Sequence, residues 1–582
     1  MATESFLSEF PPITTEQWEH IIREKITGAE YASKLIWHPE EGFAVKPYYR
    51  ADDLAGIQFL DAAPGTFPFV RGTRSDGDWR IREEIDLVDA ANANSAACAA
   101  VVGGAEEIAF RRPKLGGTAD LATLLGNLHE IPIVFAGSEP GLVRLVMERI
   151  SLHPHGTSIS TELDPLVDLE LSAELIRNGP QGFRPFVIDA EQFQERAASS
   201  LEEVGFALSA GVDFVAEMQA RGLSLDRITR CMSFSFAMGP EFFIQIAKLR
   251  AFRLVWAKSV ESFGGAEETA RTSIHGCTAR WNATLYDPQV NILRATTEAL
   301  SAVLGGADSI SISPFDECFR YPDESSRRLA RNTQIIFKQE AFLSRVSDPV
   351  GGSYLIEALT NSIAARAWKL FQELESAGGY RKAVGTGLIA SVLEKRLQSR
   401  DEAVAFRRRA LTGTNRFADA SEHATQPIDA SQSASSARAA QYFESLRLRT
   451  QHYTSKTGRR PRIVLAEIGD AKMRSARSQF AADFLACAGL TAEKSFFESA
   501  ERIADFDADV IVLCSSDAEY LSIAVELMQI LKVRGSAAKV IIAGNPGNAE
   551  QLRDVGIVEF IHLLSNAVVV LGRIQQLIGI KD

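Results

Sequence analysis

The sequence predicts an α/β protein with two domains: an N-terminal (β/α)8 TIM barrel and, after a linker, a C-terminal flavodoxin-like domain with a doubly wound parallel sheet. Three observations predict this architecture. Strand-like apolar runs alternate with longer helical patterns from residue 80 to residue 400, and about 250 residues of such alternation are typical of a closed barrel. A stretch poor in large apolar residues follows. The alternation then resumes at residue 462 with a five-fold rhythm that suits a smaller doubly wound sheet.

The 582 residues divide accordingly into four parts: an N-terminal extension (1–70), the barrel (71–411), the linker (412–460) and the C-terminal domain (461–582). The extension is rich in turns and aromatic side chains, and a helical stretch begins in it at Gln17. The linker is dense in Ala, Ser, Thr and Gln, with a helix-compatible piece at 439–449. We therefore expect an extended connection there and not a third core.

The clearest barrel strands are short apolar runs at 131–135, 185–188, 230–236, 271–274 and 309–313. The most regular helix runs from Pro240 to Phe263, because its apolar residues recur at three- or four-residue spacing and a proline suits its first turn. Much of the remaining helix surface is basic: Lys248, Arg250, Arg253 and Lys258. We expect a barrel-wall helix with a solvated basic face.

In the C-terminal domain, strands are expected at 463–466, 492–496, 510–513, 540–543 and 559–562, with helices at 476–488, 519–531 and 567–577. Ligands of such sheets bind beyond the carboxyl ends of the strands, so the first loop, Glu467–Met473, is the one of interest. It has one glycine and nothing like Gly-x-Gly-x-x-Gly, so it is not a dinucleotide site. We expect Asp470 to cap the following helix.

The overall charge excludes some classes of function. Lys and Arg number 62 and Asp and Glu 75, so the formal net charge is −13. An acidic surface repels phosphate backbones, and no dense basic patch offsets it, so no nucleic-acid binding is expected. No run approaches about 18 apolar residues and no targeting signal is seen, so no membrane association is expected. Six widely spaced cysteines favour a reducing compartment, and we expect a cytoplasmic protein.

Isolated polar side chains give only weak candidates for chemistry. His153 and His155 are clustered, but a metal site needs further ligands, so a plain loop is the better interpretation. His275 follows a predicted barrel strand, where catalytic residues gather. Asp189 and Glu191 end another strand and could act as an acid–base pair, although solvent-facing carboxylates are commoner. The same interpretation applies to two further acidic pairs, Glu106-Glu107 and Asp316-Glu317.

Longer segments resemble the adenosylcobalamin-dependent acyl-CoA mutases, and methylmalonyl-CoA mutase in particular. They run in the family's order over nearly the whole chain: 68–72 (PFVRG), 236–258 (FAMGPEFFIQIAKLRAFRLVWAK), 287–294 (DPQVNILR), 315–317 (FDE), 328–334 (RLARNTQ) and 348–354 (DPVGGSY). Family members place a barrel before a cobalamin-binding domain. The resemblance implies a place in the radical interconversion of (R)-methylmalonyl-CoA and succinyl-CoA, a reaction of propionate metabolism in which the cofactor supplies the chemistry.

The C-terminal domain departs from this family where the cofactor would bind. Active members carry Asp-x-His-x-x-Gly in the first loop, and the histidine ligates cobalt. Alignment at Gly469 places Ala471 at the aspartate, Met473 at the histidine and Ala476 at the glycine. Met473 cannot act as the imidazole ligand, and Ala471 cannot orient one by a hydrogen bond.

Two later elements are changed as well. In active family members, these elements line the slot for the cofactor's nucleotide tail. The family's Ser-x-Leu stands here as Ser515-Ser516-Asp517, and its Gly-Gly as Gly544-Asn545. The carboxylate of Asp517 and the side chain of Asn545 should crowd the slot. Because all three elements are degraded together, we expect no cobalamin on this chain.

The barrel departs from the family in the same way. The segment Arg71–Gly77 has no tyrosine, where active members carry a tyrosine-bearing loop over the substrate. Glu191 and Gln192 stand where active members have Tyr-His, whose histidine hydrogen-bonds the migrating thioester. Gln192 cannot act as an imidazolium, and Glu191 adds negative charge beside an anionic substrate. We expect no catalytic residue here; Glu191 and Gln192 are vestigial, and Arg271 is a weak candidate for contact with a CoA phosphate.

These departures resemble the pattern of the non-catalytic small (beta) subunit of heterodimeric members of the family. The resemblance implies a homologous catalytic large (alpha) subunit as the partner, and adenosylcobalamin bound by that partner. Two other functions stay open from the sequence. One is a self-sufficient mutase acting on another acyl-CoA, and the other is a regulatory subunit that holds CoA in its barrel.

Overall fold

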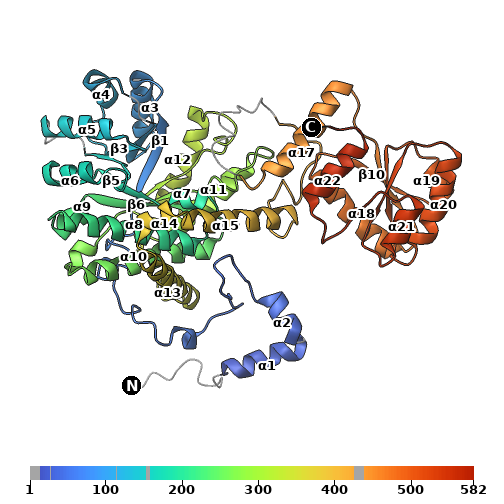
Figure 1. The fold of residues 1–582 in the computed structure, drawn as a ribbon, viewed down its shortest axis with the longest axis horizontal. Helices are drawn as coiled ribbons and strands as arrows, with labels where there is room; N and C mark the ends of the chain where they lie inside the picture. Colours follow the sequence, from blue (N-terminus) through green and yellow to red (C-terminus); the bar gives the residue numbers. More distant parts are fainter. Residues whose placement is uncertain (1–12, 27, 113–114, 153–157, 425–437, 582) are drawn as a thin grey trace.

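The larger domain is a nearly closed barrel of eight parallel strands (Figure 1). The computed structural model describes residues 13–26, 28–112, 115–152, 158–424 and 438–581. The strand order is β4-β3-β2-β1-β8-β7-β6-β5. Strands β4 and β5 meet through an isolated parallel bridge between Leu163 and Phe186. The strands are β1 (Arg80–Asp86), β2 (Glu107–Arg111), β3 (Ile133–Ala136), β4 (Ile159–Thr161), β5 (Phe186–Asp189), β6 (Met232–Met238), β7 (Ile274–Thr278) and β8 (Ser309–Ser311). The predicted fold class is confirmed for this domain.

Helices connect and surround these strands. Those between β1 and β8 are α3 (Ala90–Val102), α4 (Thr118–Leu125), α5 (Pro140–Leu152), α6 (Leu169–Asn178), α7 (Glu191–Glu195), α8 (Ser200–Ala220), α9 (Leu225–Arg230), α10 (Phe242–Ser262) and α11 (Val290–Leu304). After β8 come α12 (Glu324–Gln339), α13 (Tyr354–Ser376), α14 (Tyr380–Gly385) and α15 (Leu388–Ala405). Short 3-10 turns occur at η1 (Ala51–Leu54), η2 (Glu267–Ala270) and η3 (Leu343–Arg345). Helix α13 packs on α8 and α10, so a second layer of helices covers one side of the barrel.

The sequence located some barrel strands and missed others. The predictions at 131–135, 185–188, 230–236 and 309–313 coincide with β3, β5, β6 and β8 to within a few residues. The prediction at 271–274 is wrong, because β7 begins at its last residue. Strand β1 was not predicted, since its sequence Arg-Ile-Arg-Glu-Glu-Ile-Asp contains no apolar run. Its charged residues find ion-pair partners on β2 and, for Glu83, on α12, which a local pattern cannot show.

Helix α10 confirms the predicted helix but not its solvated basic face. Lys248, Arg250 and Arg253 are 0%, 1% and 1% exposed. Lys248 lies 2.7 Å from Glu203 of α8, and Arg250 lies 2.8 Å from Glu357 of α13. The prediction was wrong because α8 and α13 pack against this face and bring carboxylates to it.

The predicted linker contains a helix that joins the second domain. Helix α17 (Gln441–Thr457) includes most of the helix-compatible piece at 439–449 and packs on α22 (Ala567–Leu577). Its Phe443 and Leu446 are buried in the core of the C-terminal domain. Residues 425–437 of the predicted linker lie outside the described residues. The domain boundaries themselves stay a prediction.

The C-terminal domain is a five-stranded parallel sheet in the order β10-β9-β11-β12-β13. Its strands are β9 (Ile463–Glu467), β10 (Ala492–Phe496), β11 (Val510–Cys514), β12 (Lys539–Ala543) and β13 (Glu559–Ile561), and all five were predicted. The remaining helices are α18 (Ala471–Ala486), α19 (Ala500–Ala504), α20 (Tyr520–Val533) and α21 (Ala549–Val555). Helices α17, α18 and α22 cover one face and α19 to α21 the other, which confirms a doubly wound, flavodoxin-like sheet.

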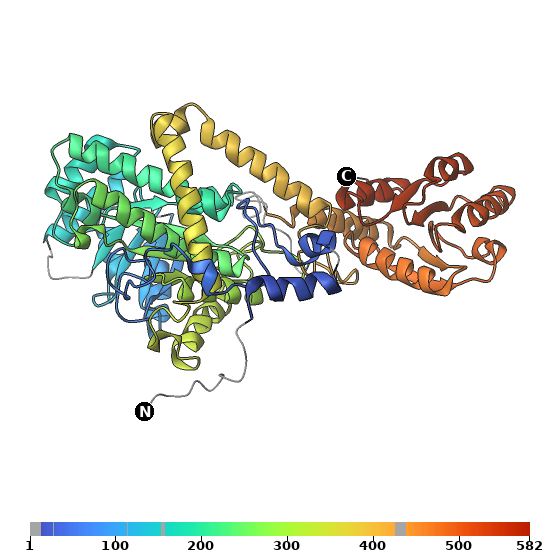
Figure 2. The ribbon, with the colours of Figure 1, turned by 90° about the horizontal axis from the view of Figure 1, so that it is seen from below.

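The N-terminal extension carries α1 (Thr15–Lys25) and α2 (Gly28–Leu35) and then returns to the barrel (Figure 2). Phe43 and Val45 are buried in the barrel core and fix the inner part of the extension. Among the described residues, no helix is long and apolar enough to cross a membrane.

Candidate functional site

The carboxyl ends of the barrel strands carry a network of ion pairs. Arg111, the last residue of β2, lies 3.2 Å from Glu84 and 3.1 Å from Asp86 of β1. It also contacts Glu317 in the loop after β8. Arg280, in the loop after β7, lies 3.3 Å from the same Glu317. Burial disfavours the charge on Glu317, but the two guanidinium groups outweigh this effect and lower its pKa to about 2.

Three of the four residues in the acidic pairs interpreted as solvent-facing belong to the interior, contrary to expectation: Glu107, Asp316 and Glu317. The side chain of Glu106 is 43% exposed. Glu107 is buried within β2 and lies 2.5 Å from Arg82, which in turn contacts Glu162 at 2.8 Å. Asp316 is fully buried and accepts a hydrogen bond from Arg320 Nε at 2.6 Å. The burial of Glu107 was missed because its partner Arg82 lies on another strand, 25 residues earlier in the sequence.

Asp189 and Glu191 lie together at the carboxyl end of β5, as predicted. The Ser235 hydroxyl of β6 donates to Asp189 Oδ1 at 3.2 Å. Burial and the negative charge of Asp189 raise the pKa of Glu191 to about 8. Gln192 is exposed, and its side-chain amide donates to the Asp189 carbonyl at 2.8 Å. The position thus offers a carboxyl group that holds its proton at neutral pH, and no imidazole.

Two other candidates lie away from this end of the barrel. His275 is inside β7 and not after it, with its ring nitrogens 2.9 Å and 3.1 Å from the hydroxyls of Ser309 and Ser311. Burial lowers its pKa well below the usual value, so the ring is neutral. Arg271 precedes β7, at the amino end of the strands, and lies 2.9 Å from Glu268. Both side chains are already engaged within the chain.

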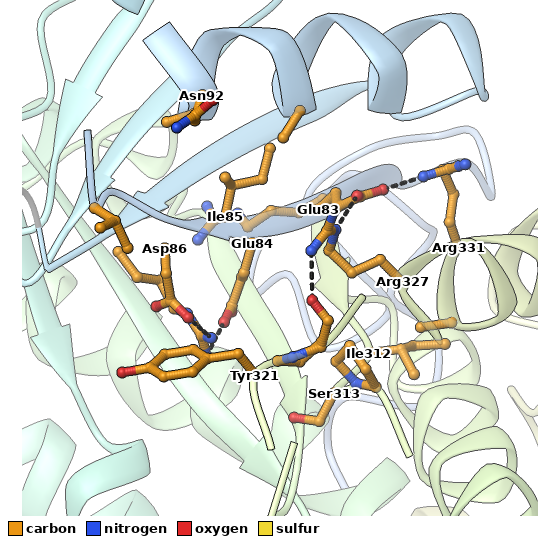
Figure 3. A pocket seen from close by; sticks show the side chains of 18 of the residues that line it. Glu83, Glu84, Ile85, Asp86, Asn92, Ile312, Ser313, Tyr321, Arg327 and Arg331 are labelled. Carbon is orange, nitrogen blue, oxygen red and sulfur yellow. Dashed lines mark hydrogen bonds and ion pairs between the residues drawn. The ribbon is translucent and has the colours of Figure 1, made fainter. Parts of the chain in front are cut away.

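A cavity of about 360 Å³ opens beside β1, between α3 and α12 (Figure 3). Strand β8 ends at Ser311, which pairs with Arg82, so β1 continues beyond it to Asp86, and the cavity lies beside this last part of β1. Glu83 points into it and lies 3.6 Å from Arg327, and it also contacts Arg331. Tyr321 lies at its edge and is half exposed. No sequence signal indicated this cavity, because β1 has no apolar run.

No metal centre is found among the described residues. No group of three or more His, Cys, Asp or Glu side chains there is arranged to hold an ion. The predicted loop histidines, His153 and His155, lie outside the described residues.

In the C-terminal domain, the first loop and the start of α18 are closed by internal contacts. Asp470 accepts a hydrogen bond from the Met473 amide at 2.8 Å, which confirms the predicted cap. Glu519 accepts from the Ser515 hydroxyl at 2.7 Å and from the Ser516 hydroxyl at 2.6 Å. These bonds lower the pKa of Glu519 to about 2.

Glu519 also reaches beneath the loop, where a Cβ added at Gly469 would lie 2.5 Å from its carboxylate. Because Gly469 also has φ +78°, only glycine suits this position. Ala471 and Ala476 lie on α18 directly after the loop. The space beneath the loop is therefore already occupied by the chain's own carboxylate.

The adjacent slot is spanned by an ion pair. Arg477 of α18 lies 2.9 Å from Asp517, which follows β11. A Cβ added at Gly544, after β12, would lie 2.9 Å from Arg477 Nη1. The fully buried Tyr520 donates to the carbonyl of Ala543 at 2.7 Å.

The predicted cofactor-type positions are thus brought together on one edge of the sheet. They follow the three adjacent strands β9, β11 and β12: Gly469, Ala471, Met473 and Ala476; Ser515 and Asp517; and Gly544 and Asn545. The side chains that occupy this edge, Arg477 and Glu519, were not singled out by the sequence analysis.

The chain is similar to known proteins over most of its length. The family model described as methylmalonyl-CoA mutase matches residues 169–477, which is more than half of the chain. The methylmalonyl-CoA mutase small subunit of Porphyromonas gingivalis is 32% identical, with 99% of this chain and 99% of that protein covered. The chain belongs to the methylmalonyl-CoA mutase family. The small subunit of Streptomyces virginiae is 31% identical over 93% of this chain and 94% of its own length.

A third relative of this mutase-family chain is matched less completely. The methylmalonyl-CoA mutase of Rhizobium meliloti is 30% identical, but only 72% of this chain and 65% of that protein are covered. The similarity to small subunits thus extends over almost the full chain, whereas that to this mutase does not.

The holoenzyme of this family uses cobalamin, but the residues of this mutase-family chain do not fit that group. Met473 presents a thioether where an imidazole is needed. Asp470 is already used as a helix cap. Arg477 and Asp517 form an ion pair across the slot. No step of a reaction on this chain is therefore assigned to the cofactor.

Proposed function

We propose that the chain is the non-catalytic small subunit of a heterodimeric methylmalonyl-CoA mutase. In this proposal a homologous large subunit binds adenosylcobalamin and interconverts methylmalonyl-CoA and succinyl-CoA. The present chain supports that subunit and itself carries neither cofactor nor catalytic residues.

One observation carries the proposal. In the C-terminal domain, the edge of the sheet where the family binds its cofactor is occupied by the chain's own side chains. A single substitution at position 473 would remove one ligand and leave the space intact. Here Glu519 lies under the first loop, and Arg477 pairs with Asp517 across the slot at 2.9 Å. The Asp517 side chain is 51% exposed, so breaking the pair itself costs about 0–1 kcal/mol, and a ligand must in addition displace both side chains from the slot.

The barrel gives independent support. The place expected for a substrate-binding histidine holds the exposed Gln192 and a Glu191 whose pKa is about 8. Arg111 and Arg280, which could attract an anion, already share Glu317. A net charge of −13 also makes the chain poorly suited to attracting anionic CoA esters alone.

Co-expression with the cognate large subunit, followed by corrinoid quantitation per chain, tests the proposal. We expect a stable heterodimer with one corrinoid, while the isolated chain has no corrinoid absorbance and no mutase activity. Two corrinoids per heterodimer would overturn it. Turnover by the isolated chain would indicate a self-sufficient mutase, and calorimetric binding of CoA esters to it would indicate a regulatory CoA-binding subunit.

A further inference from the structure

A second cavity, of about 180 Å³, lies between α11 and the loops that follow β7 and β8. It is smaller than the pockets of about 300–1,000 Å³ that hold drug-sized ligands. Asp189 and Gln192 are not among the described residues that line it, so it is distinct from the position expected for the thioester. Its charged lining consists of five arginines and three glutamates: Arg111, Arg112, Arg280, Arg294, Arg438, Glu195, Glu298 and Glu317.

Three of these arginines have carboxylate partners within the chain. Arg111 and Arg280 share Glu317, and Arg438 lies 2.7 Å from Glu444 of α17. Burial disfavours the charge on Arg111 and Arg438, but the carboxylates outweigh it and the pKa of both groups is raised. Glu317 likewise raises the pKa of Arg280. The charges of these three guanidinium groups are therefore compensated.

Arg294 of α11 is not compensated in this way. Its guanidinium donates to neutral oxygens: Thr284 Oγ1 at 3.0 Å, Asn291 Oδ1 at 2.8 Å and the Thr412 carbonyl at 2.7 Å. It forms no ion pair with a described residue. Burial lowers its pKa, and the attraction of Glu298 does not offset this effect. Buried charges are normally paired, so an anion beside Arg294 would be stabilised.

The glutamates of the lining do not supply that anion. Glu298 lies one turn along α11 from Arg294, and its Oε1 accepts a hydrogen bond from the Asn282 amide at 2.6 Å. Burial raises the pKa of Glu298 to about 8, so this carboxyl keeps its proton at neutral pH. Glu195 lies 3.3 Å from Arg280 and is used there.

The rest of the lining indicates what kind of anion fits. Arg112, directly after β2, is exposed and forms no ion pair with a described residue, so it adds a cation at the surface. Several other lining residues are apolar: Ala279, Ala283, Ala295, Pro314 and Phe315. A small polyanion would leave oxygens against these apolar groups without hydrogen-bond donors, which is costly. A single negative charge on a short hydrocarbon chain suits both parts of the lining.

We propose that this cavity binds a small monocarboxylate with a short aliphatic chain. The carboxylate pairs with Arg294, and the chain lies against the alanine side chains. Arg112 attracts the anion towards the cavity. A CoA ester is too large for about 180 Å³, so this site is separate from any retained binding of CoA in the barrel.

Titration of the full-length chain with sodium butyrate at constant ionic strength, followed by ligand-observed NMR, tests the proposal. We expect saturable binding. Arg294→Gln should raise the dissociation constant by about tenfold or more, because it removes a charge-assisted hydrogen bond. Ala295→Leu keeps every charge but fills the apolar part, so it should weaken binding as well. Circular dichroism shows whether each variant folds; if Arg294→Gln does not, Arg112→Gln, at an exposed position, takes its place.

The matched control is Arg328→Gln, because Arg328 is an exposed arginine of α12 outside the cavity lining. Its dissociation constant should stay within about twofold of the wild type. Absence of saturable butyrate binding overturns the proposal, as does binding that is unchanged in the folded cavity variants. Equal affinity for n-butanol would show that the charge plays no part, and equal affinity for sulfate that the chain plays none. Either result would also overturn it.

Discussion

At the scale of single residues, two carboxyl groups at the barrel mouth behave in opposite ways. Glu317 lies between Arg111 and Arg280 and stays ionised down to a pKa of about 2. Glu191 is buried beside Asp189, and its pKa is raised to about 8. Arg111 and Arg280 thus pair with Glu317 in the loop after β8. The Asp189–Glu191 pair is left without a strong cationic partner. Such a pair reduces stability, because the unfolded chain would ionise both groups.

We expect Glu191→Gln to stabilise the fold at high pH. In the unfolded chain this carboxyl titrates near 4.5, whereas the fold keeps its proton up to about pH 8. Unfolding therefore releases a proton, and the wild type loses stability as pH rises from 4.5 to 8. Glutamine removes this loss, so the variant's free energy of unfolding should exceed that of the wild type by roughly 1–3 kcal/mol at pH 8, and by little at pH 4. Urea denaturation at both pH values measures this, and equal stabilities at pH 8 would contradict it.

At the scale of elements, a helix or strand could be predicted from the sequence when its own residues show the pattern. It could not be predicted when the pattern depends on residues that it contacts elsewhere in the chain. Strands β9, β11 and β12 of the C-terminal domain are apolar runs buried on both faces, and they were located from those runs. Strand β10, Ala-Glu-Lys-Ser-Phe, is largely exposed and was located from the regular alternation of strands and helices. Strand β1 was not located because it has no apolar run, and its Arg82 and Glu84 are neutralised by Glu107 and Arg111 of β2. Helix α10 was located from its period, but the burial of its basic residues depends on α13, a hundred residues later, and no local pattern reports that contact. The same limit applies to the candidate site in the C-terminal domain. Resemblance to the family located the positions whose residues differ from the cofactor motifs, but it did not point to Arg477 and Glu519, whose side chains occupy the site.

The two kinds of basic residue on α10 give a matched comparison. Arg250→Ala should lower the free energy of unfolding by about 3–5 kcal/mol, because it leaves Glu357 buried without its guanidinium partner. Lys258→Ala, on the same helix, should change it by less than about 1 kcal/mol, because Lys258 is exposed, pairs with the exposed Glu261 and otherwise makes a cation–π contact with Phe67 at 5.0 Å. Guanidinium chloride denaturation of both variants checks the pair. Equal effects would mean that α10 carries the solvated basic face the sequence suggested.

At the scale of the whole molecule, both places where a mutase would work are altered while the architecture that holds them is intact. The barrel is nearly closed and the C-terminal sheet keeps its doubly wound order. The charges at the barrel mouth and at the cofactor edge are paired within the chain. A chain selected for its shape and its interfaces would retain the fold in this way.

This distinction between a lost ligand and a filled site leads to a last prediction. Ala471→Asp/Met473→His restores the family's Asp-x-His pair in the first loop. If the missing imidazole were the only obstacle, this variant would retain cobalamin. We expect it to elute from size exclusion without corrinoid absorbance, because Arg477 and Asp517 still span the slot at 2.9 Å.

Adding Arg477→Ala and Asp517→Leu to that variant removes the ion pair, places the family's leucine at 517 and should increase the bound corrinoid. The matched control, Arg477→Ala/Asp517→Leu alone, opens the slot without a cobalt ligand and should bind less than the combined variant. Stoichiometric corrinoid on Ala471→Asp/Met473→His would show that the filled slot is no barrier. The failure to bind cobalamin would then rest on the two side chains at 471 and 473 and not on the whole edge of the sheet.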